Sequence, residues 1–125
     1  MEVPEDRRYT EQHEWARAEE AGVRVGITDY AQEALNEVVV VSLPDTGRRC
    51  RAGEVVVEID STKSVAEVYS PLDGSVVEVN SALLEHPELV NEDPYGAGWL
   101  VLLAADDPGA LDGLMDAAAY RALTG

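Results

Sequence analysis

The sequence predicts a mainly β fold, with one short helix in the N-terminal half and one or two short helices at the C-terminus. Val23, Val25 and Ile27 alternate with polar or small residues, which is typical of a half-buried strand. The runs EVVVVSL (37–43) and EVVVEID (54–60) are rich in β-branched residues, which favour strands. Turn residues separate the runs, so the strands are expected to be short and joined by tight connections.

The first part of the chain is expected to hold an edge strand followed by a helix. YTEQHEWAR (9–17) is interpreted as the edge strand, and TDYAQEALN (28–36) predicts a short helix. Asp29 is suited to cap the start of this helix, and Gln32 stands at the capping-box distance from it. Asn36 is suited to its end, because asparagine often replaces glycine in a left-handed cap.

The middle of the chain is expected to be built from strands and turns. EVVVVSL (37–43) contains a continuous β-branched run and predicts a strand buried on both faces. EVVVEID and SVAEVYS (64–70) lie three residues apart, which predicts a hairpin. The other segments are expected to be a turn region at 44–53, a turn at 71–74, a strand at 75–80, a long connection with a helical turn at 81–98, and a buried strand at 99–104.

The C-terminal tail is expected to be helical. Leu111, Leu114 and Met115 have the i, i+3, i+4 spacing of an apolar helix face, and Tyr120 and Leu123 repeat it. One or two short helices are therefore predicted there.

Composition sets limits on the class of protein. The 125 residues fit one domain, expected to span 1–125, with a core at about 9–105 and a helical tail at about 108–123. With 25 acidic and 9 basic side chains the net charge is −16, which disfavours nucleic acid and anionic membranes as partners. The lone Cys50 has no cysteine to pair with, and MEVPEDRRYTEQ has no signal-peptide pattern. We expect a cytoplasmic, bacterial protein.

Lys63 is the only lysine of the chain, and it lies between the two strands of the predicted hairpin. The tip sequence DSTK lacks glycine, which favours a type I turn or a slightly longer loop over a primed turn. A catalytic lysine needs burial or a nearby cation to lower its pKa. Here the neighbouring acids Asp60 and Glu67 favour the charged form instead. The pattern therefore indicates a site of covalent attachment.

At this point the chain resembles a known family, the glycine cleavage system H proteins. The most specific matches are HEW, GITDYAQ and NEDPYGAGW, in that order along the chain. The resemblance runs from about Tyr9 to Leu123. Its stretches are YTEQHEW (9–15), VGITDYAQEAL (25–35), VVVVSLPDTG (38–47), the DSTK loop, YSPLDGSVVEVNSAL (69–83) and PELVNEDPYGAGWL (87–100).

The resemblance implies a barrel-sandwich hybrid of antiparallel strands, as in lipoyl and biotinyl domains, with lipoate joined by an amide to Lys63. It implies a non-catalytic carrier that shuttles the aminomethyl group of glycine. The implied partners are a pyridoxal-phosphate glycine decarboxylase, a tetrahydrofolate-dependent aminomethyltransferase, dihydrolipoamide dehydrogenase and lipoate-attaching enzymes. The free protein is expected to be a monomer. The extended lysine and lipoyl chain would reach on the order of 14 Å from the Cα atom.

By position, the resemblance also assigns roles to five other residues. Asp60, Ser61 and Thr62 would be recognised with the lipoyl loop, and Glu14 and Glu67 are candidates to face the arm. In the family the loaded arm can fold into a surface cleft, where a carboxylate would pair with the amino group of the cargo.

Three departures from the family pattern affect fine recognition. Asp60 replaces the usual glutamate of E-S-V-K, and Ala34 replaces a histidine found in some members. An aromatic residue of the family core is also missing from Asn36-Glu37-Val38-Val39-Val40-Val41.

Other functions remain open beside the carrier. The same platform would serve a lipoyl relay to 2-oxo acid dehydrogenases, a standalone lipoyl or biotin carrier, or an unmodified paralogue. Thr62 and Ser64 stand where biotin acceptors usually have methionine, which disfavours biotin. No motif of a nucleotide-binding site or hydrolase occurs.

The remaining residues that chemistry could use have structural interpretations. His13 and His86 lack zinc-site spacing. Cys50 lies among arginines but suits a core position, and NEDPY (91–95) is interpreted as a solvated turn rather than a calcium site.

Overall fold

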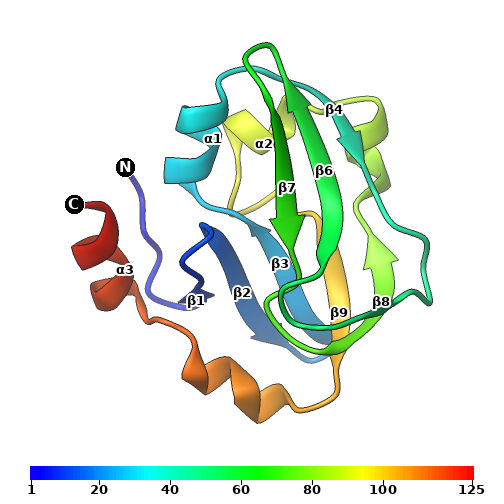
Figure 1. Ribbon diagram of the computed structural model, residues 1–125, viewed down its shortest axis with the longest axis vertical. Coiled ribbons are helices and arrows are strands. Elements are labelled where there is room, and N and C mark those ends of the chain that lie inside the picture. The colour runs from blue at the N-terminus through cyan, green and yellow to red at the C-terminus, as the bar shows by residue number, and fades with distance from the viewer.

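The structure, a computed structural model, describes residues 1–125 and contains two antiparallel sheets. The larger sheet has the strand order β1-β2-β3-β9-β8-β5, and the smaller has the order β4-β6-β7. Figure 1 shows the β6–β7 hairpin in front of β3 and β9 of the larger sheet. The strands are β1 (Arg8–Tyr9), β2 (Glu14–Glu19), β3 (Gly22–Ile27), β4 (Val38–Ser42), β5 (Arg49–Cys50), β6 (Val55–Ser61), β7 (Val65–Tyr69), β8 (Gly74–Val79) and β9 (Val101–Ala105).

Five short helical segments complete the chain. They are α1 (Asp29–Leu35), the 3₁₀ segment η1 (Ser81–Leu84), α2 (Leu89–Glu92), the 3₁₀ segment η2 (Pro108–Gly113) and α3 (Ala117–Thr124). The expected fold class is confirmed: the chain is mainly β, with two antiparallel sheets, a helix in the N-terminal half and short helices at the C-terminus.

A core of twenty buried residues joins the two sheets. Val25 and Leu103 enter it from the larger sheet, and Val57 and Ile59 enter it from the smaller one. Burying such side chains stabilises the fold by about 1.5–3 kcal/mol each. Cys50 is part of this core, as expected for a small apolar filler, and burial raises the pKa of its thiol.

A smaller core ties the two ends of the chain together. It contains Val3, Tyr9, Trp15, Tyr95, Ala117 and Tyr120. The rings of Tyr9 and Tyr120 stack with their centroids 4.7 Å apart. Trp15 donates its indole N–H to the Pro94 carbonyl at 3.0 Å. Figure 1 shows α3 beside the N-terminal segment, as this packing requires.

The expectation of one edge strand over 9–17 was wrong. A tight turn divides this segment into β1 and β2, which pair antiparallel with Tyr9 opposite Trp15. The turn closes through the His13 amide, which donates to the Thr10 carbonyl at 3.1 Å. His13 has φ = 68°, a left-handed conformation. The alternation of polar and apolar residues in 9–17 could not predict this turn.

The predicted helix at 28–36 is present, but its cap lies one residue earlier than expected. Thr28, not Asp29, accepts the Ala31 amide on its hydroxyl at 3.2 Å. Asp29 is the first helical residue and accepts the Gln32 side-chain amide at 2.7 Å. Asn36 ends the helix as predicted, with a positive φ of 64°, but its ψ of −146° lies outside the left-handed helical region that was expected.

The expectation that 37–43 is buried on both faces was also wrong. β4 is an edge strand of the smaller sheet, and only Val38 and Val41 are buried in the core. A register shift between Val38 and Val40 leaves Val39 45% exposed and Val40 49% exposed. The valine run therefore reflects strand propensity rather than two-sided burial.

The C-terminal tail is helical, but the expected face is interrupted. Leu111 belongs to η2, whereas Leu114 is extended and Met115 forms a β-bridge with Tyr9. The Tyr9 amide donates to the Met115 carbonyl at 2.8 Å, and the Met115 amide returns a bond of 3.0 Å. Asp116 then caps α3 by accepting the Ala119 amide. Pairing with β1 overrides the helical spacing here.

Candidate functional site: the lysine hairpin and its cleft

Lys63 is exposed at the tip of the β6–β7 hairpin. The hairpin was predicted, and its register pairs Asp60 with Val65 just below the tip. In Figure 1 the tip projects at one end of the molecule, beyond the body of both sheets. The side chain therefore stands where another protein can reach it without local unfolding.

The tip is organised by Ser61. Its hydroxyl oxygen accepts the amides of Lys63 at 3.2 Å and Ser64 at 3.0 Å, and the hydroxyl donates to the Ser64 carbonyl. The Thr62 amide donates to the Glu37 carbonyl at 2.9 Å. These bonds satisfy the backbone of a turn that has no glycine. The root of Lys63 is thus held while its side chain is free.

Asp60 lies on the outer face of the hairpin between two exposed valines. Val40 and Val65 are its register partners on the two neighbouring strands. They are 49% and 61% exposed. The Oδ1 atom of Asp60 is buried and has no hydrogen-bond partner. This face therefore presents a partly exposed carboxylate beside apolar surface, directly below the lysine, although the Oδ1 atom itself is shielded from solvent.

A cleft of about 240 Å³ opens next to the tip, and the predicted residues Glu14 and Glu67 both line it. Ser64, the residue after the lysine, also lines it, so the cleft begins within reach of the Lys63 side chain. Its walls come from the turn before β2, from α1, and from β7. The lining residues are Gln12, Glu14, Ile27, Ala31, Ala34, Leu35, Ile59, Ser64, Ala66, Glu67 and Val68.

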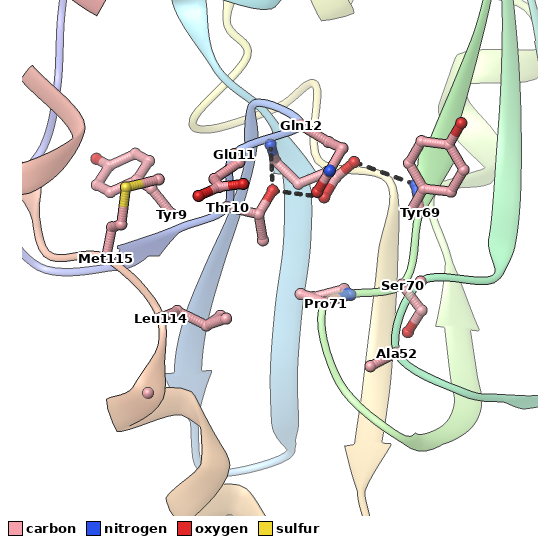
Figure 2. A pocket seen from close by; sticks show the side chains of 13 residues that line it. Tyr9, Thr10, Glu11, Gln12, Ala52, Tyr69, Ser70, Pro71, Leu114 and Met115 are labelled. Atoms are coloured by element: carbon pink, nitrogen blue, oxygen red, sulfur yellow. Dashed lines mark hydrogen bonds between the residues drawn. The ribbon is translucent and has the colours of Figure 1, made fainter. Parts of the chain in front are cut away.

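Glu14 and Glu67 differ in their surroundings. Glu67 is exposed on β7, whereas Glu14 is only 2% exposed. The Glu14 carboxylate accepts the Thr10 hydroxyl at 2.6 Å and the Tyr69 amide at 3.2 Å. Figure 2 draws these hydrogen bonds as dashed lines, with Thr10 at one end and Tyr69 at the other. Burial raises the pKa of the Glu14 carboxyl, and the hydrogen bonds lower it by less.

Glu14 also separates the cleft from a second cavity of about 320 Å³, which Gln12 lines as well. In Figure 2, Leu114 and Met115 stand on one side of this second cavity, and Ala52, Ser70 and Pro71 stand on the other. The buried carboxylate is therefore a partition between an apolar cleft beside the lysine and a more open cavity beside the tail.

The raised pKa of Glu14 predicts a pH-dependent stability difference between wild type and Glu14→Gln. A carboxyl whose folded pKa is raised stabilises the fold below its unfolded pKa, about 4.3 for glutamate. That contribution is lost as pH rises through the folded pKa. The free energy of unfolding of wild type, minus that of Glu14→Gln, should therefore fall as pH rises from about 4 toward neutrality.

Urea unfolding of both proteins at a series of pH values measures this difference. Glu67→Gln is the control, because Glu67 is exposed, and its difference from wild type should stay flat. A Glu14→Gln difference that stays flat or rises with pH would contradict the burial argument.

Several contributors to the site were not found from the sequence. Ala31 and Leu35 line the cleft because α1 lies against it, and so does Ala34, which was singled out from the sequence only as a departure from the family pattern. The Glu14 carboxylate is held by Thr10, four residues before it, and by the Tyr69 amide, 55 residues after it. The short spacing between Thr10 and Glu14 was the one sequence feature that could have predicted the first of these hydrogen bonds.

The interpretation of NEDPY as a solvated turn was only partly right, because Glu92 and Asp93 are exposed but Pro94 and Tyr95 are buried. In NEDPY, the Asp93 carboxylate accepts the Ala97 amide at 2.9 Å, and the Pro94 carbonyl accepts the Trp15 indole. His13 is part of a hydrogen-bonded chain with Tyr120, described below. No group of three or more His, Cys, Asp or Glu side chains is arranged to hold a metal ion.

Comparison with known proteins identifies the family. A family model described as glycine cleavage H-protein matches residues 7–125. This chain belongs to the glycine cleavage H-protein family. Members of this family are carriers that bear lipoate, so lipoate is the cofactor, and their partner subunits are those of the glycine cleavage system.

Individual H proteins match over nearly the whole chain. The glycine cleavage system H protein of Anaeromyxobacter sp. is 51% identical over 122 residues, covering 98% of this chain and 95% of the relative. That of Thermus thermophilus is 52% identical over 121 residues, covering 97% and 94%. The crystal structure of a glycine cleavage system H protein from Mycobacterium marinum superposes with a TM-score of 0.89 at 41% identity, covering 98% of this chain and 99% of that chain.

These matches confirm the expected family, and the similarity to a solved H protein confirms the barrel-sandwich type of fold. The relatives named here are bacterial. None of the helices has the length and apolar character needed to span a bilayer.

Proposed function

We propose that this H-protein family member is lipoylated on Lys63 and carries the aminomethyl group of glycine between the enzymes of the glycine cleavage system. The observation that carries the proposal is the position of the one lysine of the chain, exposed at the tip of a hairpin whose backbone Ser61 fixes. A tether of roughly 14 Å raises the local concentration of the cargo at each docked enzyme. Residues 1–125 would act as one carrier domain, with the core at about 9–105 and the tail at about 108–123.

The cleft beside Lys63 has the chemistry to receive the arm. Its lining is largely apolar, as an aliphatic chain requires, and the Glu14 carboxylate stands at its inner wall. When attached, lipoate supplies a dithiol that accepts and releases the cargo. The protein would contribute a dry wall and one buried carboxylate that pairs with the cationic amino group. Glu67 would act from the exposed rim.

The partners would be the pyridoxal-phosphate glycine decarboxylase, the tetrahydrofolate-dependent aminomethyltransferase and dihydrolipoamide dehydrogenase. The chain itself would catalyse no bond change, because no nucleophile–base pair faces the cleft, and we propose a cytoplasmic monomer. A net charge of −16 is suited to docking faces that carry basic side chains.

An exchange assay tests this function against the lipoyl relay. Glycine decarboxylase exchanges the glycine carboxyl with bicarbonate only when a working carrier accepts the aminomethyl group. Lipoylated wild type should support that exchange at micromolar concentration. Transfer of its lipoyl group to an acyltransferase domain, without any glycine–bicarbonate exchange, would favour the relay instead.

Asp60 and Thr62 would be contacted by the lipoate-attaching enzyme. That enzyme must bring its active site to the Lys63 side chain, so it has to cover the adjacent hairpin face, where the partly exposed Asp60 carboxylate lies between Val40 and Val65. Asp60→Ala should slow lipoylation by about 10- to 100-fold, the worth of one charge-assisted hydrogen bond. Glu58→Ala is the matched control, since Glu58 is exposed two residues further down β6. Equal initial rates for both variants in a lipoylation time course would remove Asp60 from recognition.

A further inference from the structure

Tyr120 links the two walls of the cleft although it lies on the C-terminal helix. Its hydroxyl is 2.7 Å from Nδ1 of His13 and 2.7 Å from the hydroxyl oxygen of Thr28. His13 stands between Gln12 and Glu14, which form one wall. Thr28 caps α1, which forms the facing wall. The Tyr120 hydroxyl therefore joins the turn before β2 to the start of α1.

The neighbouring contacts strengthen this link. The Thr28 amide donates to the His13 carbonyl at 3.0 Å, so the two segments are also joined through their backbones. The His13 ring lies 4.5 Å from the ring of Tyr30 on α1. Tyr120 is itself fully buried and stacked on Tyr9. Its hydroxyl position is thus set by packing in the smaller core rather than by the cleft.

The direction of the hydrogen bonds follows from what Thr28 can satisfy. Its oxygen accepts the Ala31 amide, and its side chain is completely buried, so its own proton needs an acceptor. The Tyr120 oxygen is that acceptor, and the Tyr120 proton then goes to Nδ1 of His13. The opposite direction would leave the buried Thr28 proton without a partner. Nδ1 of His13 is therefore an unprotonated acceptor, and burial lowers the His13 pKa in agreement.

We propose that Tyr120 is a positioning residue that holds the arm cleft closed around its cargo, through His13 to the Glu14 wall and through Thr28 to α1. This inference rests on the proposed function, because it assumes that the loaded arm lies in the cleft. Loss of the hydroxyl leaves the two walls joined only by the Thr28–His13 backbone bond and the contact between the His13 and Tyr30 rings, so both walls loosen, while the buried Tyr120 ring keeps α3 packed. Without the Tyr120 hydroxyl, water should reach the cargo, while the protein still folds and is still lipoylated.

Tyr120→Phe tests this, with Tyr9→Phe as the matched control. Tyr9 is equally buried and stacked on Tyr120, but its hydroxyl donates only to the Pro4 carbonyl and touches neither wall. Ammonia release from protein loaded with the aminomethyl group should be roughly tenfold faster in Tyr120→Phe than in wild type. In unlipoylated protein, hydrogen exchange of the Ala31 amide should accelerate by a similar factor. Tyr9→Phe should match wild type in both measurements.

A second pair of variants covers the case in which Tyr120→Phe is too unstable to load. His13→Gly and His13→Asn both tolerate the left-handed backbone at this position. Only asparagine offers a side-chain oxygen in place of Nδ1. His13→Gly should therefore leak ammonia and His13→Asn should hold it.

The outcomes separate this inference from the function on which it rests. If Tyr120→Phe and His13→Gly retain ammonia as wild type does, while Glu14→Ala loses it, the positioning role is overturned and the carrier function stands. If wild type releases ammonia as fast as the aminomethyl adduct of free dihydrolipoamide, the cleft protects nothing and the positioning role is overturned, whereas the carrier function is overturned only if lipoylated wild type fails to support glycine–bicarbonate exchange.

Discussion

Lys63→Arg is expected to abolish carrier activity completely. Arginine keeps the positive charge and much of the length, but its guanidinium is not an acceptor for the amide linkage that lipoate requires. Glycine–bicarbonate exchange should fall to the level measured without the protein. Because the side chain is exposed, the free energy of unfolding should change by less than about 0.5 kcal/mol.

The control for Lys63→Arg is Arg51→Lys, which places a lysine on the exposed part of the 44–53 connection, near the base of the hairpin rather than at its tip. It should be lipoylated once, on Lys63 alone. Exchange activity that survives in Lys63→Arg would show that another group carries the cargo.

Glu14→Ala is expected to give the second largest effect, a rise in ammonia release from the loaded protein. A buried carboxylate that pairs with the cationic amino group contributes about 1.5–3 kcal/mol, so the rate should rise roughly 10- to 100-fold. Glu14→Gln should give a similar rise, because the amide fills the space without the charge. Ammonia is measured after removing glycine and the decarboxylase.

Glu67→Ala supplies the comparison for Glu14, since Glu67 lines the same cleft from an exposed position. A solvent-screened carboxylate contributes little to binding a cationic group. Glu67→Ala should therefore release ammonia at most a few times faster than wild type. Equal leakage from wild type and Glu14→Ala would remove Glu14 from the protection of the cargo.

The part of the site that could be predicted from the sequence is the part encoded locally. The hairpin around Lys63 follows from two valine-rich runs three residues apart. The absence of glycine in DSTK disfavoured a primed turn, and no residue of this loop has a positive φ. Ser61 organises that turn through bonds to residues two and three positions away. Such short-range bonds leave a signature in the sequence.

The parts that were missed or misplaced depend on pairing between distant segments. Val39 and Val40 are exposed because β4 is a sheet edge, and a run of valines has the same appearance at an edge and in the centre. Met115 leaves the helical pattern to pair with Tyr9. The Tyr120 hydroxyl meets His13 and Thr28 across 107 and 92 positions of the sequence. No local pattern carries those contacts.

The most direct test of the carrier account is the intact mass of the protein, with peptide mapping. Wild type and Lys63→Arg would be purified from a host supplied with both lipoate and biotin. The account predicts one lipoyl addition on the peptide that contains Lys63, and none on the variant. A biotin adduct, or an unmodified lysine while other proteins of the same cells are lipoylated, would contradict it.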